Sequence, residues 1–201
     1  ARCRDVLGEK AGALTTLWRD KQLQYSWLRS LQHRYVDFAE VTEAALDFAM
    51  RSLAIEDAAL RSRLLAVYQT LEPFPEVAEV LGRLRAAGYR TAILSNGSPA
   101  MLAPLVAHGG LGGLLDAVLS VDEVGVFKTD PRVYQMALDR LGVTTDAVCF
   151  FSSNAWDAWA ASDFGMRVVW CNRYAQPPEN LPGRPDAEVR TLIEALPLLL
   201  G

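Results

Sequence analysis

The sequence predicts an α/β protein with a doubly wound, Rossmann-like parallel-sheet core and a helical cap subdomain, and three observations favour this class. Residues 13–66 carry apolar side chains at helical spacing only. Residues 76–171 alternate between helical patterns and short apolar runs, which is typical of βαβ units and a parallel sheet. Hydrophobic residues make up 51% of the 201, enough to bury a core. We therefore expect the cap over residues 1–72 and the core over residues 73–201.

The individual elements follow from local patterns along the chain. In the cap, residues such as Leu14 and Trp18 recur at the spacing of one helix face. In the core, Ser98 and Asp130 each precede a proline, which pairs a capping side chain with a first-turn residue that opens a helix. We expect core helices at residues 76–87, 99–108, 131–141 and 155–163. We expect core strands at residues 89–95, 116–120, 147–152 and 166–171, followed by a proline-rich tail and a short final helix.

Charge and cysteine content exclude several classes of function. The net charge is −4 and residues of both signs are interspersed, which excludes an extended basic surface for nucleic acid. Apolar runs are shorter than a membrane span, and the chain does not open with a signal-peptide pattern. Cys3, Cys149 and Cys171 form no Cys-x-x-Cys pair, which favours a reducing compartment. We expect a soluble, cytoplasmic enzyme that acts on a small molecule.

Polar residues follow three of the predicted strands. They are the run Ser95-Asn96-Gly97-Ser98, the segment from Asp122 to Lys128, and the run Ser152-Ser153-Asn154 with Asp157 after it. The carboxyl ends of parallel strands meet at one edge of the sheet, where ligands bind, so these residues form one candidate site.

Each of these residue types has a simpler alternative role. Ser95 and Asn96 could cap the next helix. Lys128 could be a solvated surface residue, as most lysines are. Asp157 is favoured in the first turn of a helix by the helix dipole, whatever its function.

Six runs of the sequence carry a family resemblance. The runs are Trp18-Arg19 with Lys21-Gln22-Leu23, Tyr25-Ser26-Trp27-Leu28-Arg29, Tyr35-Val36-Asp37-Phe38, Leu94-Ser95-Asn96-Gly97-Ser98, Phe127-Lys128, and Ser152-Ser153-Asn154-Ala155-Trp156-Asp157. Together they resemble the type II L-2-haloacid dehalogenases of the haloacid dehalogenase superfamily. The resemblance implies hydrolysis of short L-2-haloacids to D-2-hydroxy acids through an aspartyl ester, with water as the second reactant. It also implies a homodimer.

The resemblance assigns roles to residues that bind the substrate. Arg19 receives the leaving halide with the help of Asn96, because a guanidinium offers several donors and keeps its charge. Ser95 and Lys128 bind the substrate carboxylate and steady the nucleophile. Tyr134 organises Lys128 through hydrogen bonding.

Other residues serve the hydrolytic step or enclose the substrate. Ser152, Asn154 and Asp157 position or activate the water that opens the ester. An apolar wall surrounds the alkyl part of the substrate and is formed by Leu23, Phe38 and Trp156. Ordinary core packing is the alternative role for these three.

The resemblance also separates a dehalogenase from a phosphatase. Phosphatases of the superfamily need Mg²⁺ and usually carry an acidic residue where this strand ends in Ser152 and Ser153. Because Mg²⁺ prefers charged oxygen ligands, we expect a site without metal or other cofactor. Two alternatives stay open: a small-molecule phosphatase of the same superfamily, and a catalytically inactive relative that binds carboxylates. Thr129 stands where the family commonly has proline, which is a minor departure.

The nucleophile of the family is a separate matter. It lies at the end of the first core strand, in a run Asp-x-Tyr-Gly-Thr-Leu that precedes every segment discussed above. Asp5 follows no strand pattern and Asp20 lies on a predicted helix, so neither replaces it. We expect the nucleophile upstream of Ala1, on a central strand between those that end at Ser95 and Ser152. Residues 1–201 alone are then expected to be inactive because the nucleophile is missing. They are also expected to be unstable, because two apolar strands would lack a partner.

Overall fold

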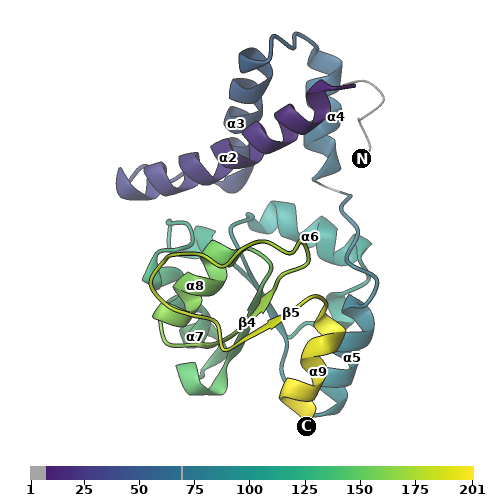
Figure 1. Cartoon of the computed structure of the whole chain (residues 1–201), viewed down its shortest axis with the longest axis vertical. Coiled ribbons are helices and arrows are strands. Elements are labelled where there is room, and N and C mark those ends of the chain that lie inside the picture. The colour runs from purple at the N-terminus through teal and green to yellow at the C-terminus, as the bar shows by residue number, and fades with distance from the viewer. Residues whose placement is uncertain (1–7, 69) are drawn as a thin grey trace. The chain divides into compact units, whose positions relative to one another are not determined.

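The structure is a computed structural model that describes residues 8–68 and 70–201 (Figure 1). Its helices are α2 (Lys10–Leu31), α3 (Phe38–Ser52), α4 (Ala58–Val67), α5 (Val77–Ala86), α6 (Pro99–His108), α7 (Pro131–Leu141), α8 (Ala155–Asp163) and α9 (Leu192–Leu200). Its strands are β1 (Ala92–Ser95), β2 (Ala117–Ser120), β3 (Cys149–Ser152), β4 (Arg167–Cys171) and β5 (Ala187–Val189). The predicted α/β class is confirmed.

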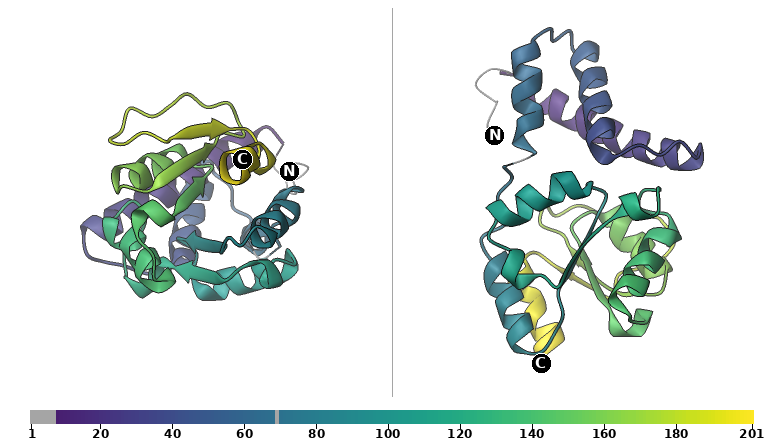
Figure 2. Two further views of the ribbon diagram at one scale, coloured as in Figure 1. Left: turned by 90° about the horizontal axis from the view of Figure 1, so that it is seen from below. Right: turned by 180° about the vertical axis from the view of Figure 1, so that it is seen from behind.

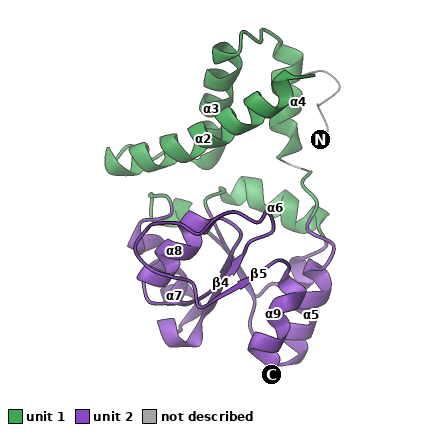
Figure 3. Ribbon diagram, in the orientation of Figure 1, with its two compact units in different colours: residues 1–72, 96–109, 120–127 green, residues 73–95, 110–119, 128–201 purple. Residues whose placement is uncertain are grey.

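The chain divides into two compact units (Figure 3). The first contains residues 1–72 together with residues 96–109 and 120–127, and the second contains residues 73–95, 110–119 and 128–201. A cap that ends at residue 72 stays a prediction.

Helices α2, α3 and α4 of the first unit pack through a shared apolar cluster that includes Leu14, Leu46 and Leu60. Polar contacts between α2 and α3 are buried with it. The indole of Trp18 donates to the carbonyl of Thr42 at 2.9 Å. The amide of Gln22 donates to the hydroxyl of the same threonine at 2.8 Å. Because buried polar groups are costly unless paired, these bonds fix how the two helices meet.

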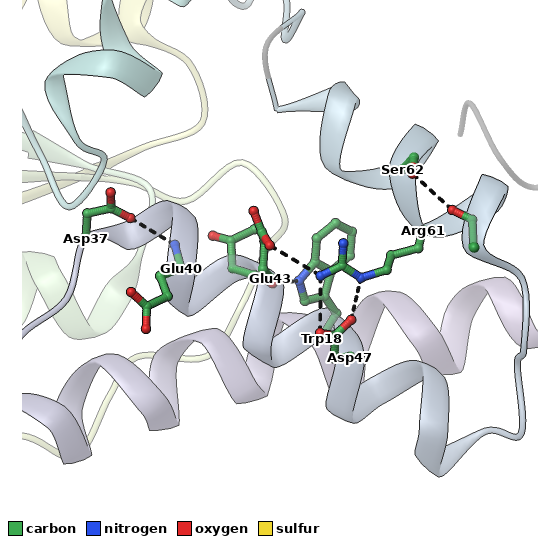
Figure 4. A network of polar contacts seen from close by, with 9 residues as sticks. Trp18, Asp37, Glu40, Glu43, Asp47, Arg61 and Ser62 are labelled. Carbon is green, nitrogen blue, oxygen red and sulfur yellow. Dashed lines mark hydrogen bonds and ion pairs between the residues drawn. The ribbon is translucent and has the colours of Figure 1, made fainter.

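Charged side chains cap and join the same helices (Figure 4). Asp37 precedes α3 and accepts a hydrogen bond from the backbone N–H of Glu40 at 2.9 Å, the usual arrangement of an N-terminal cap. On the surface, Arg61 of α4 contacts Asp47 of α3 at 2.5 Å, with side chains that are 32% and 39% exposed. The Arg61 guanidinium lowers the pKa of Asp47 through this hydrogen bond.

A three-stranded parallel sheet, in the order β3-β4-β5, forms one half of the second unit. Side chains of alternate residues of β4 lie on opposite faces of this sheet. Val168 and Trp170 pack against a cluster with residues of α7 and α8. Val169 and Cys171 pack against a cluster that includes a residue of α9. Figures 1 and 2 show α7 and α8 on one side of these strands and α5 and α9 on the other. A parallel sheet covered on both faces is the doubly wound arrangement that the sequence predicts.

Strands β1 and β2 form a separate two-stranded sheet. Asp116, just before β2, accepts a hydrogen bond from the backbone of Thr91, just before β1, at 2.8 Å. The sequence prediction missed one strand, β5, because three residues after a proline-rich segment are too few to show an alternating pattern. In the described part of the chain, helices long and apolar enough to cross a membrane are absent.

Candidate active site

A buried carboxylate at the end of β3 collects three hydrogen-bond donors. Asp157 accepts from the ammonium of Lys128 at 2.9 Å and from the hydroxyl of Ser152 at 2.8 Å, both on Oδ2. Its Oδ1 accepts from the hydroxyl of Tyr134 at 2.8 Å. We call these four residues the Asp157 cluster. All four belong to the second unit, and the lysine and the aspartate are only 6% and 3% exposed.

Local folding explains why these side chains meet. Strand β3 ends at Ser152, and α8 begins at Ala155, which places Asp157 in the first turn of that helix. Lys128 lies shortly before α7, whose cap Asp130 accepts from a backbone N–H at 2.9 Å. Tyr134 lies in the first turns of α7 and is fully buried. The helix dipole favours Asp157 here, but its oxygens serve side chains, so capping alone does not describe its role.

Hydrogen bonds satisfy the buried Asp157 carboxylate on both of its oxygens. A buried ion pair persists only when hydrogen bonds satisfy the remaining lone pairs, and Ser152 and Tyr134 supply them. Burial, together with the charge and hydrogen bond of Asp157, raises the pKa of the Tyr134 phenol well above its usual value. The phenol therefore stays a donor across the ordinary pH range. Lys128 also lies over the ring of Phe150, with 4.8 Å from its nitrogen to the centroid.

One pair of contacts bears on the role predicted for Tyr134, which is to organise Lys128 through hydrogen bonding. The phenol of Tyr134 donates to Asp157, and the same carboxylate accepts from the Lys128 ammonium. Asp157 therefore links Tyr134 to Lys128. Whether these residues serve catalysis remains a prediction.

The other predicted site residues lie on several elements. Asn154 stands at the N-cap position of α8 without a side-chain capping hydrogen bond, and its backbone N–H donates to the Ser152 hydroxyl at 3.2 Å. Ser95 is the last residue of β1, in the second unit, and the next residue, Asn96, belongs to the first unit. Trp156, the second residue of α8, is half-buried.

Three predicted site residues come from the helices of the first unit. Arg19 and Leu23 are half-buried residues of α2. Burial lowers the pKa of Arg19, while the nearby Tyr68 and Asp20 oppose the shift. Phe38 begins α3 and packs its ring 6.0 Å from that of Phe127, which fits the packing role given as its alternative.

A cavity of about 660 Å³ lies inside the second unit. Its lining includes Ile93 and Leu94 of β1, Phe150 and Phe151 of β3, and side chains of α5, α7 and α9. The two strands belong to different sheets. The space is therefore bounded by two strands and by helices.

Two remaining points concern residues without a predicted role and the question of a metal site. No role was predicted for Tyr35, Ser120 or Asp122, although Tyr35 lies in one of the family-like runs and Asp122 begins one of the polar segments that follow the predicted strands. For metals, groups of three or more His, Cys, Asp or Glu side chains placed to hold an ion are absent from the described residues.

Replacing Tyr134 by phenylalanine removes one donor from the buried Asp157 carboxylate. We expect the free energy of unfolding to fall by about 1–3 kcal/mol, the usual effect of an unmade hydrogen bond to a buried charged group. Urea unfolding measures this. The matched control is Tyr89→Phe, which removes a hydrogen bond of 2.6 Å from an exposed tyrosine and should cost less. Equal losses of unfolding free energy in the two variants would contradict a buried hydrogen bond from Tyr134 to a charged Asp157.

Comparison with known proteins places this chain in a family. The profile of the haloacid dehalogenase-like hydrolases matches residues 9–165. The (S)-2-haloacid dehalogenase 4A of Burkholderia cepacia is 46% identical over 199 residues, which cover 98% of this chain and 86% of that protein. A solved dehalogenase structure matches with a TM-score of 0.96 and 45% identity, over 100% of this chain and 89% of the other.

A further solved structure is the L-2-haloacid dehalogenase of Xanthobacter autotrophicus with chloropropionic acid covalently bound. It matches with a TM-score of 0.89 and 34% identity, over 100% of this chain and 91% of the other. The family profile covers more than half of the chain, and the Burkholderia relative aligns with nearly all of it at high identity. The chain belongs to the haloacid dehalogenase-like hydrolase family.

Proposed function

We propose that this protein hydrolyses short L-2-haloacids to D-2-hydroxy acids through an aspartyl ester, without a metal ion or other cofactor. The observation that carries the proposal is the Asp157 cluster, which holds the Lys128 ammonium beside the end of β3. A fixed positive charge at the carboxyl edge of a parallel sheet suits a small carboxylate substrate. The names of its similar relatives support the same reaction.

The proposed reaction has two steps. A carboxylate attacks C2 of the haloacid, the carbon–halogen bond breaks with inversion, and the halide leaves toward Arg19 and Asn96. Water then adds to the carboxyl carbon of the ester, and the hydroxy acid leaves with its C2–O bond intact. Because C2 is inverted once, an L-haloacid gives a D-hydroxy acid. The solved relative with covalently bound chloropropionic acid supports an intermediate of this kind.

Each step has its own residues in this proposal. Ser95 and Lys128 hold the substrate carboxylate and steady the nucleophile. Ser152, Asn154 and Asp157 position the water. The Asp157 carboxylate already accepts three hydrogen bonds from side chains, so its role is to hold Lys128 in place.

We place the nucleophile on a strand that enters the cavity between β1 and β3. The cavity is lined by apolar residues of both strands, and their carboxyl ends carry Ser95 and Ser152. A parallel strand in this place would end between those two serines. An aspartate at its end would then lie beside the Asp157 cluster.

The alternative enzymatic hypothesis is a phosphatase, and the dependence of activity on metal distinguishes a phosphatase from a dehalogenase. We expect halide release from L-2-chloropropionate to be unchanged by EDTA, because Ser152 and Ser153 stand where a phosphatase carries an acidic Mg²⁺ ligand and displacement at carbon needs no metal. Hydrolysis of p-nitrophenyl phosphate, with and without added Mg²⁺, is the parallel assay. Phosphate release that needs Mg²⁺, without halide release, would show that the phosphatase reading is right.

A binding protein without catalysis is the alternative from another class. It would bind chloropropionate with Arg19, Ser95 and Lys128 and release no halide, which calorimetry and a halide electrode distinguish. A cytoplasmic location, a homodimer and a cap–core division at residue 72 remain part of the proposal. Sedimentation at several concentrations tests the dimer.

A further inference from the structure

We propose that Tyr35, Asp122, Ser120 and Ser30 form a latch that fixes the two loops carrying Asn96 and Lys128. They are positioning residues and need not touch the substrate. The inference rests on the proposed function, since that function gives the two loops their roles. All four residues belong to the first unit, as does each residue that they contact below.

The first arm of the latch is a relay of hydrogen bonds. The hydroxyl of Ser120, at the end of β2, donates to the carbonyl of Gly97 at 2.8 Å in a buried position. The backbone N–H of Asp122 donates to the same hydroxyl at 3.2 Å. The phenol of Tyr35 donates to the Asp122 carboxylate. The relay thus ties the connection between α2 and α3 to the turn that contains Asn96.

The second arm holds the residue before Lys128. The backbone N–H of Phe127 donates to the hydroxyl of Ser30, near the end of α2, at 3.0 Å. The Phe127 ring is 1% exposed and lies 4.9 Å from the ring of Tyr35 between centroids. Tyr35 therefore takes part in both arms, through its hydroxyl in one and its ring in the other.

The tyrosine keeps this role across a wide range of pH. Burial raises the pKa of the Tyr35 phenol far above its usual value, and the hydrogen bond and charge of Asp122 and the charge of Asp37 add to the shift. The phenol therefore remains a donor wherever the enzyme would be assayed, and the latch itself is not expected to depend on pH.

The roles proposed for the two loops explain why such a latch would matter for the reaction. One loop carries Asn96, assigned to the leaving halide, and the other carries Lys128, assigned to the substrate carboxylate. In-line displacement needs both ends of the substrate fixed at once. A shift of about 1 Å in groups that orient a substrate can cost roughly 100-fold in rate.

The test uses the active protein with its nucleophile segment and compares Tyr35→Phe with Tyr89→Phe. The first keeps the ring and loses only the bond to Asp122, and the second loses a hydroxyl bond to the carbonyl of Leu199 in the other unit. We expect Tyr35→Phe to lower kcat/KM for L-2-chloropropionate by about 10-fold or more, and Tyr89→Phe to leave it unchanged. The melting temperatures of the two variants should agree within a few degrees.

A conservative variant separates positioning from loss of structure. Asp122→Asn keeps an oxygen that accepts from Tyr35 and should retain most of kcat/KM, whereas Asp122→Ala should match Tyr35→Phe. Because both changes cut the same bond, the double variant Tyr35→Phe with Asp122→Ala should be no worse than either single one. Additive losses, or equal losses in the Asn and Ala variants, would overturn the latch.

Hydrogen exchange provides a measurement that does not need activity. In Ser30→Ala, the amide of Phe127 loses its acceptor and should exchange faster, while amides of β4 keep their rates. If the unaltered protein releases no halide, the proposed function fails, and exchange alone then decides whether the latch exists. If the unaltered protein is active but Tyr35→Phe keeps its full kcat/KM, the latch is wrong.

Discussion

An apolar segment ending in Asp-x-Tyr-Gly-Thr-Leu, placed before Ala1, is expected to raise halide release from L-2-chloropropionate by about 10⁴-fold or more over residues 1–201 alone. The magnitude is that of restoring a covalent nucleophile, without which only binding and orientation remain. The segment should also raise the urea midpoint if, as proposed, it adds a strand that fills the cavity of about 660 Å³ and pairs the edges of β1 and β3.

The control for this comparison is the same segment with its aspartate replaced by alanine. It should give the same gain in stability and no halide release, because the strand is present and the carboxylate is not. Rapid halide release by residues 1–201 alone would contradict the proposed nucleophile. So would an alanine control as active as the aspartate segment. A gain in activity without a gain in stability would argue against a strand in the cavity.

Replacing Lys128 by methionine should be the most damaging single substitution in the described chain. It leaves the Asp157 carboxylate buried at 3% exposure without its counter-charge. Breaking a buried pair in this way typically costs about 3–5 kcal/mol, measured by urea unfolding. Halide release should also be lost in conditions where the variant is folded, because no cation would hold the substrate carboxylate.

Two comparisons make the Lys128 result specific. Arg61→Met breaks the surface pairs with Asp47 and Glu43 and should cost no more than about 1 kcal/mol. Adding Asp157→Asn to Lys128→Met removes the unpaired charge and should recover part of the lost stability without recovering activity. If Lys128→Met and Arg61→Met lower the free energy of unfolding equally, the Asp157 cluster is not a buried ion pair as described above.

Much of the fold could be predicted from the sequence because its signals are local. Pro99 and Pro131 begin α6 and α7 as expected from the capping residues before them. Gly142 has a φ of +62° and ends α7, which is the left-handed conformation that glycine tolerates. Asp157 lies in the first turn of α8 because the apolar strand and its polar end fix the start of that helix.

What could not be predicted depends on contacts between distant residues. Tyr35 and Asp122 are separated by 87 positions, and no periodicity in the sequence indicates that they form a hydrogen bond. Tyr134 donates to Asp157 because of how α7 and α8 pack beside β3. The spacing of residues in the sequence does not indicate this packing. The grouping of residues 120–127 with the helices of the first unit has the same origin, since Ser30 and Tyr35 bind that segment.

The most direct test of the central claim is the configuration of the product formed from each enantiomer of 2-chloropropionate, in EDTA, by the protein that carries its nucleophile segment. We predict one D-2-hydroxypropionate and one chloride from each L-2-chloropropionate consumed, and no reaction with the D-enantiomer. An L-product, halide release that stops in EDTA, or phosphate-ester hydrolysis without halide release would contradict the account.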